Sequence, residues 1–191
     1  MRTTKTLISA GFVATLATGA MIAAAAPAHA DSRTCRGTIS SKSIDADVRV
    51  PAGATCTIKR SSIDGNVTVG KNARVRIENS SVDGNVKGSY SRSVVVIRSS
   101  IDGNVQINSS KYHYLLSNRI DGNIQAKNNT GTKRAHSNRV DGDIQYFSNR
   151  GTTTIRTNRV DGNLQCKSNV PGPTGYKNVV KGNKEGQCKR L

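Results

Sequence analysis

The hexad Ser62-Ile63-Asp64-Gly65-Asn66-Val67 decides the fold, because the chain repeats it with few changes along its length. Close copies stand at 81–86, 100–105, 119–124, 139–144 and 159–164. A degenerate first copy occupies 43–48, and a decayed last copy occupies 180–184. The aspartate position recurs after nineteen residues in the first four steps and after twenty in the last three. Self-similarity at such a period is the signature of a stacked repeat fold.

Three apolar rows emerge when the copies are aligned on the aspartate. One row lies directly before it, one lies three residues after it, and one lies five residues before the first row. Polar residues alternate with the apolar ones, as in Val75-Arg76-Ile77, a pattern typical of short strands with one buried face. Such strands bury that face only by stacking. We expect an all-β, single-stranded parallel β-helix of about seven coils of 19–20 residues, right-handed because parallel crossovers usually are.

Residues 1–30 have the pattern of a secretory signal peptide rather than of the fold. A basic start with Arg2 and Lys5 precedes an apolar stretch, and Ala28-His29-Ala30 offers a small-x-small cleavage site. The alternative is a membrane anchor, since the apolar run approaches the length that spans a bilayer. The secretory interpretation predicts a mature β-helix domain at 31–191, either extracellular or associated with the cell wall.

Four cysteines remain after the signal peptide, and an even count in an exported chain favours disulfides. Three pairings are possible in principle, and the repeat favours Cys35 with Cys56 and Cys166 with Cys188. In each pair, the two residues fall on adjacent coils, offset by two positions. We expect one disulfide at each end of the solenoid, where strand edges would otherwise be open.

One aspartate per coil forms a ladder, whose main members are Asp64, Asp83, Asp102, Asp121, Asp141 and Asp161. Stacked carboxylates repel one another, so we expect turn amides to bond to them and the corner glycine to supply the unusual backbone angle of the turn. Calcium binding is the alternative, but each coil offers one carboxylate among nearby cations. Two rows of Asn and Ser accompany the ladder, and we expect them to hydrogen-bond along the axis as in other stacked β structures. We predict a structural role for these rows, with no metal and no cofactor.

The predicted mature chain is strongly basic. Without Arg2 and Lys5, the 29 basic residues fall to 27, which against 12 acidic residues leaves a formal charge of +15. We expect adhesion to an anionic polymer or cell-surface component, without nucleic-acid specificity. The alternative is that the charge only keeps the protein soluble. The candidate polyanion-binding residues are Arg74, Arg76, Arg119, Lys133, Arg134, Arg139 and Arg159.

A possible partner face is predicted in the middle coils, where Tyr112, Tyr114, Tyr146 and Phe147 gather in a chain otherwise poor in aromatic residues. An enzyme is the main functional alternative, because polysaccharide lyases and glycosidases use parallel β-helices. Such enzymes need a cleft and carboxylates in differing environments. The nearly constant coil length leaves little chain for loops, so we expect a non-catalytic module. Self-assembly into a structural polymer is a third possibility.

The closing segment carries a family resemblance. Residues 163–173 and 180–188 resemble the cap of small secreted right-handed β-helix proteins of actinobacteria, and the likeness extends over nearly the whole mature chain. That resemblance implies the β-helix fold and no assigned activity. More loosely, the chain is similar to the bactofilins, whose short β-helices polymerise end to end. The predicted export and the paired cysteines depart from that family. Neither likeness supplies catalytic residues.

Overall fold

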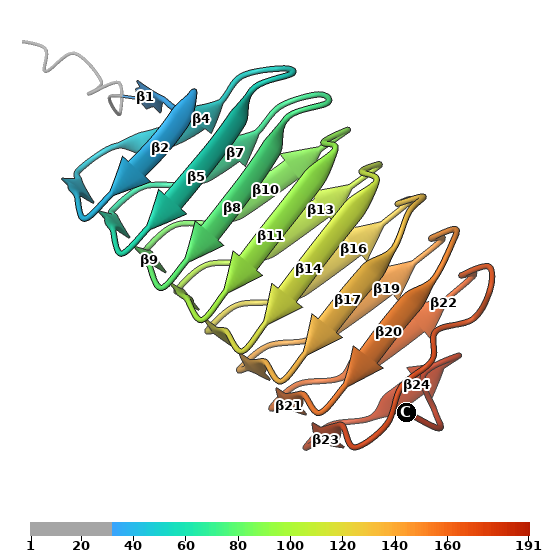
Figure 1. Ribbon diagram of the computed structural model, residues 1–191. Helices are drawn as coiled ribbons and strands as arrows, with labels where there is room; N and C mark the ends of the chain where they lie inside the picture. The colour runs from blue at the N-terminus through green and yellow to red at the C-terminus, as the bar shows by residue number, and fades with distance from the viewer. Residues whose placement is uncertain (1–31) are drawn as a thin grey trace, which may run out of the picture.

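The computed structural model describes residues 32–191 and shows a parallel β-solenoid with all of its regular structure in strands. The predicted signal peptide at 1–30 lies outside the described residues. Successive coils stack into an elongated body with three sheets along its length (Figure 1). Every strand pairs in parallel with its counterparts in neighbouring coils, so the predicted all-β parallel solenoid is confirmed.

Sheet A has nine strands, and its outer face carries polar and charged side chains. The strands are β1 (Ser32–Thr34), β4 (Asp47–Val50), β7 (Val67–Val69), β10 (Val86–Ser89), β13 (Val105–Asn108), β16 (Ile124–Lys127), β19 (Ile144–Phe147), β22 (Leu164–Lys167) and β24 (Lys184–Gly186).

Sheet B has seven strands and follows sheet A in each coil. The strands are β2 (Gly37–Ser40), β5 (Thr55–Lys59), β8 (Arg74–Glu78), β11 (Ser93–Ile97), β14 (Tyr112–Leu116), β17 (Lys133–His136) and β20 (Thr153–Arg156).

Sheet C has eight strands of two residues each, so the hexad is present in eight coils. The strands are β3 (Ser43–Ile44), β6 (Ser62–Ile63), β9 (Ser81–Val82), β12 (Ser100–Ile101), β15 (Arg119–Ile120), β18 (Arg139–Val140), β21 (Arg159–Val160) and β23 (Val179–Val180). We name the corners by the sheets they join: A–B, B–C and C–A.

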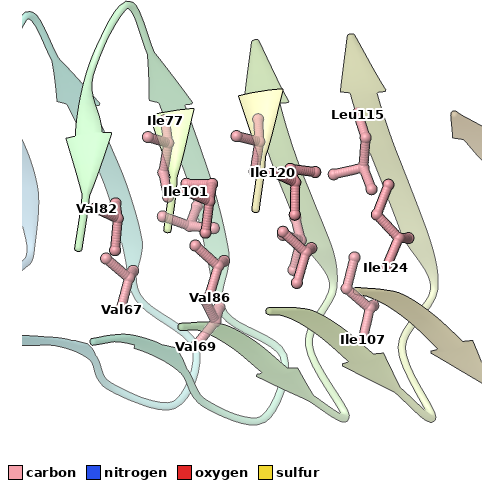
Figure 2. Packing of buried hydrophobic residues seen from close by; sticks show 14 of the residues in the cluster. Val67, Val69, Ile77, Val82, Val86, Ile101, Ile107, Leu115, Ile120 and Ile124 are labelled. Atoms are coloured by element: carbon pink, nitrogen blue, oxygen red, sulfur yellow. The ribbon is translucent and has the colours of Figure 1, made fainter. Parts of the chain in front are cut away.

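The three predicted apolar rows form the core. In the register of the sheets, Val86 lies opposite Val105, Val96 opposite Leu115, and Ile101 opposite Ile120. Side chains from all three sheets meet inside the coil and are almost completely buried (Figure 2). Strand spacing near 4.8 Å makes the seven steps between eight coils about 35 Å long. Stacking of small β-branched side chains therefore replaces the large aromatic core that this sequence lacks.

The corner glycine at the C–A corner is needed for clearance between coils. We expected it to supply an unusual backbone angle, and that expectation is wrong, because the hexad glycines do not have positive φ. A Cβ added at Gly84 would lie 2.8 Å from the carbonyl oxygen of Gly65. The first copy of the hexad carries Ala46 at this position. No described C–A corner precedes Ala46 in the stack, so none lies against its Cβ.

The asparagine row at the C–A corner binds the turn amides, a role we had expected of the neighbouring aspartates. The backbone N–H and the side-chain Nδ2 of Asn85 both donate to Oδ1 of Asn66, at 2.9 and 3.0 Å. Asp47 accepts the same pair of bonds from Asn66, at 2.7 and 3.1 Å. Each amide group therefore joins two coils, as the sequence predicted for stacked asparagines.

Two further polar rows are buried at the other corners. At the B–C corner, Asn118 accepts a bond from the backbone N–H of Ser99 at 3.0 Å and donates to the carbonyl of Val96 at 2.8 Å. At the A–B corner, Asn129 plays the same part and donates to the carbonyl of Ile107 at 2.8 Å. The B–C row was predicted from sequence, whereas the A–B row was not: Ser91, Ser110, Asn129, Asn149 and Asn169.

The predicted disulfides are confirmed at both ends of the solenoid. Cys35 bonds to Cys56 with Cα atoms 5.7 Å apart, and Cys166 bonds to Cys188 with Cα atoms 5.2 Å apart. The pairing register places Gly37 opposite Cys56, which confirms the predicted offset of two positions. Each disulfide links two adjacent coils and closes a short loop of chain. Each lies at an end of the solenoid, where the pairing of strands stops.

Candidate polyanion-binding edge

The carboxylates of the described chain gather at one corner of the coil. Of the eleven acidic residues in 32–191, nine lie at the C–A corner, seven in the aspartate ladder and two at the asparagine position. The two exceptions are Glu78 in β8 and Glu185 in β24. Negative charge therefore runs as one line along the axis of the solenoid.

Basic side chains of sheet C already neutralise part of this line. Arg119 contacts Asp121 at 2.9 Å and Asp141 at 3.0 Å, while Arg139 contacts Asp141 at 3.3 Å and Asp161 at 3.8 Å. Of the three sheet C arginines predicted to bind a polyanion, Arg119 and Arg139 thus have carboxylate partners, whereas Arg159 forms no ion pair within residues 32–191.

Lys181 continues the line of ion pairs into the last coil. Its Nζ lies 2.9 Å from the carboxylate of Asp161. This hydrogen bond, together with the charges of Lys181, Arg139 and Arg159, lowers the pKa of Asp161, although desolvation of the carboxylate opposes the shift. Ion pairs such as these offset the repulsion between stacked carboxylates in the last coils.

The A–B corner carries the opposite charge without partners. We define the basic edge as six exposed cations, one from each of six consecutive coils, that lie at this corner or at the end of the sheet A strand leading into it: Lys71, Arg92, Lys111, Lys127, Arg150 and Lys167. Within residues 32–191, none of the six lies within 4 Å of a carboxylate. The side chains are therefore available to an external anion.

Sheet B extends this positive surface beside the basic edge. Arg74, Arg76 and Arg134 occupy outward positions on β8 and β17 and are exposed. Arg76 contacts Glu78 at 3.0 Å, whereas no carboxylate of the described chain pairs with Arg74 or Arg134. Within the described residues, unpaired positive charge therefore lies both on the basic edge and on the adjoining outer face of sheet B.

Lys133 is not part of that surface, so its prediction as a polyanion-binding residue is wrong. It occupies an inward position on β17, is 0% exposed, and donates from Nζ to the carbonyls of Gly131 and Arg150. Burial lowers the pKa of Lys133 to about 8. The physical reason is alternation, because Lys133 stands two residues before the core residue Ala135 and therefore points to the same side.

Tyr146 is also interior, so the predicted partner face of four aromatic residues does not exist as one surface. Tyr146 is 0% exposed, and its hydroxyl lies 2.8 Å from Nε2 of His113. Burial raises the pKa of Tyr146, and burial together with the charge of Lys133 lowers the pKa of His113 to about 3. The two side chains form a neutral, hydrogen-bonded pair inside the coil.

The other three aromatic residues of the predicted face lie on two different sheets. Tyr112 and Tyr114 point outwards from sheet B, where they line a shallow hollow with Arg134. Phe147 points outwards from sheet A, because it follows the inward-pointing Tyr146 on β19. Phe147 shares its column of sheet A with Lys127 and Lys167 of the basic edge, whereas Tyr112 and Tyr114 lie on sheet B beyond the A–B corner.

The family model described as Toastrack DUF4097 matches residues 29–188. The chain belongs to the Toastrack DUF4097 family. No curated protein and no solved structure matches the chain. Within the described residues, the Toastrack fold includes no helix long and apolar enough to cross a membrane.

A glutamine ladder on sheet A of the Toastrack domain was missed at the sequence level. Gln106 donates to Gln125, Gln125 to Gln145, and Gln145 to Gln165, with distances of 3.2, 3.2 and 2.8 Å. Glu185 ends the row by accepting a bond from Gln165 at 2.9 Å. The signal was available, since a glutamine directly follows the second apolar row in four successive coils.

Proposed function

We propose that this Toastrack protein is a secreted, non-catalytic module that binds anionic polymers of the cell surface or its surroundings along the basic edge. The observation that carries the proposal is the separation of charge around the coil. Carboxylates line the C–A corner, whereas six unpaired cations line the A–B corner.

This separation favours binding over simple solubilisation. A surplus of charge that only prevents aggregation works best when both signs are interspersed over the surface. Here the cations of the basic edge follow one another at the spacing of the coils, about 4.8 Å. A linear polyanion laid along the solenoid could contact several of them at once, and their combined field would draw it to this edge.

The shape of the coil supports a binding role rather than catalysis. Coils of 19 to 20 residues leave corners of only a few residues between strands, without long loops to build a deep cleft. The carboxylates that an acid–base mechanism would use are spread along the C–A corner in repeated surroundings. Secretion is proposed from the signal-like residues 1–30.

Retention of the purified protein on immobilised heparin tests the proposal. Binding through several cations releases counterions, so the logarithm of affinity should fall linearly and steeply with the logarithm of salt concentration. Retention that does not change with salt would contradict binding through the basic edge. A neutral dextran resin serves as the control, and the protein should pass through it at every salt concentration.

A further inference from the structure

Phe147 lies between two lysines of the basic edge on the outer face of sheet A. Strand β19 lies between β16 and β22 (Figure 1), and the register places Lys127 of β16 and Lys167 of β22 directly opposite Phe147 of β19. Adjacent strands are about 4.8 Å apart, so the ring has a lysine side chain in the neighbouring strand on either side. Phe147 is partly exposed, whereas both lysines are exposed.

Two shallow grooves flank the ring. One has a volume of about 280 Å³ and is lined by Asn108, Gln125, Lys127 and Gln145 together with Phe147. The other has a volume of about 360 Å³, and its lining includes Gln165, Lys167 and Glu185 beside the same ring. Phe147 therefore lines both hollows, and each of them also has a glutamine and a lysine in its lining.

The glutamine ladder fixes the polar groups beside the ring. Each ladder bond uses one N–H and one lone pair of a side-chain amide, which leaves Gln125 and Gln145 with a further donor and a further acceptor each. A ligand that both donates and accepts hydrogen bonds can use both of these groups. Phosphate diesters and polyphosphate only accept them, whereas sugar hydroxyls both donate and accept.

We propose that this patch, defined as Phe147, Lys127, Lys167 and the adjoining glutamines Gln125, Gln145 and Gln165, is a subsite for an acidic polysaccharide. The inference rests on the proposed polyanion binding and names the class of polymer. A sugar ring would stack on Phe147, its hydroxyls would bond to the glutamine amides, and its carboxylate or sulfate would contact the lysines. Glu185 closes the far side of one groove, so the acidic group would face the lysines and not the end of the ladder.

A single aromatic residue favours a sugar over single-stranded nucleic acid. Nucleic-acid grooves stack successive bases on successive aromatic side chains. The outward positions of sheet A from β1 to β24 carry one aromatic residue, Phe147, in the described part of the chain. The neighbours of Phe147 in its column are Asn108, Lys127 and Lys167, so no second platform follows it.

Calorimetric titration of the full-length secreted protein with three probes tests the inference: polygalacturonate oligosaccharides, inorganic polyphosphate and oligothymidine. The test variant is Phe147→Asn, which introduces the residue that this column already holds at Asn108 and so preserves the stacking. We expect polygalacturonate affinity to fall on the order of tenfold, as for one lost stacking contact, while polyphosphate affinity is unchanged. Phe147→Trp should retain the polysaccharide affinity, and the matched control Tyr90→Ala, at a residue 63% exposed at the A–B corner three coils away, should match the wild type.

The outcomes separate the two proposals. Wild-type protein that binds none of the probes would overturn the proposed function and the subsite together. Binding of polygalacturonate and polyphosphate that Phe147→Asn leaves unchanged would overturn the subsite and support the basic edge alone. Oligothymidine bound more tightly than polygalacturonate, and lost in Phe147→Asn, would overturn the polysaccharide assignment in favour of a nucleic acid.

Discussion

Gly103 lies so close to Gly84 of the preceding coil that a Cβ on Gly103 would stand 2.7 Å from the carbonyl oxygen of Gly84. The same contact recurs between Gly122 and Gly103, also at 2.7 Å. The backbones of successive C–A corners thus stack without room for a side chain. This contact explains why the hexad keeps its glycine although φ there is not left-handed.

Substitution of a central hexad glycine should therefore destabilise the protein. We expect Gly103→Ala to lower the free energy of unfolding by about 2 kcal/mol, the usual cost of overpacking a tight site. Urea denaturation measures this change. Gly172→Ala is the matched control, because its Cβ would lie 3.6 Å from Gln187 Nε2, an ordinary contact. Equal effects of the two substitutions would show that stacking clearance is not the reason for the glycine.

The buried asparagine row makes a second prediction. Asn138 accepts bonds from the backbone N–H and the Nδ2 of Asn118, and it donates to the carbonyl of Leu115. Asn138→Ala would leave these buried groups unpaired, which should lower the free energy of unfolding by about 3 kcal/mol. Asn138→Ser should cost less, because Ser80 and Ser99 fill the same row in earlier coils. Urea denaturation in which serine is no better than alanine would contradict the role of the row.

The buried His113 makes stability depend on pH. In the folded protein its pKa is about 3, whereas an unfolded histidine titrates near 6.5. Between these values the unfolded chain binds the extra proton, so stability is highest above pH 6.5 and falls as the pH drops towards 3. The loss from this group should be about 3 kcal/mol between pH 6.5 and pH 4.

The double variant His113→Val/Tyr146→Phe isolates that contribution. Valine is the residue that stands opposite His113 in the preceding coil, and phenylalanine removes the hydroxyl that would lose its partner. Unfolding free energies of both proteins should be measured from pH 7 to pH 4 and subtracted. The difference should widen as the pH falls; parallel curves would mean that His113 does not resist protonation.

Aligning the copies of the repeat with one another predicted most of the fold. Once the hexads are superimposed, the alignment fixes which residues lie opposite each other in neighbouring coils. The disulfides followed from the same alignment, since Cys35 and Cys56 fall on neighbouring coils. Side chains along a strand point alternately inwards and outwards. Lys133 and Tyr146 each stand two residues from a core residue, Ala135 and Ile144, so this alternation would have placed both of them inside. Our prediction for Lys133 instead followed its residue type, because lysine side chains usually lie on the surface.

Contacts between coils were harder to predict, because they depend on distances in space. The sequence does not show that Gly84 and Gly103 lie close together in space. We therefore attributed the glycine to an unusual backbone angle φ and not to the clearance between coils. The basic edge was also missed as a unit. Its six cations occupy several positions of the repeat, so they align at one corner only when the coils are built.

The most direct test of the central claim compares two triple variants that remove the same charge from different corners. Arg92→Gln/Lys111→Gln/Arg150→Gln empties half of the basic edge, whereas Arg119→Gln/Arg139→Gln/Arg159→Gln changes the acidic corner. We measure heparin affinity against salt concentration for both. The edge variant should bind more weakly, with a salt slope smaller by about three, while the corner variant should keep the wild-type slope. Equal losses in both variants would show that net charge, and not the basic edge, holds the polymer.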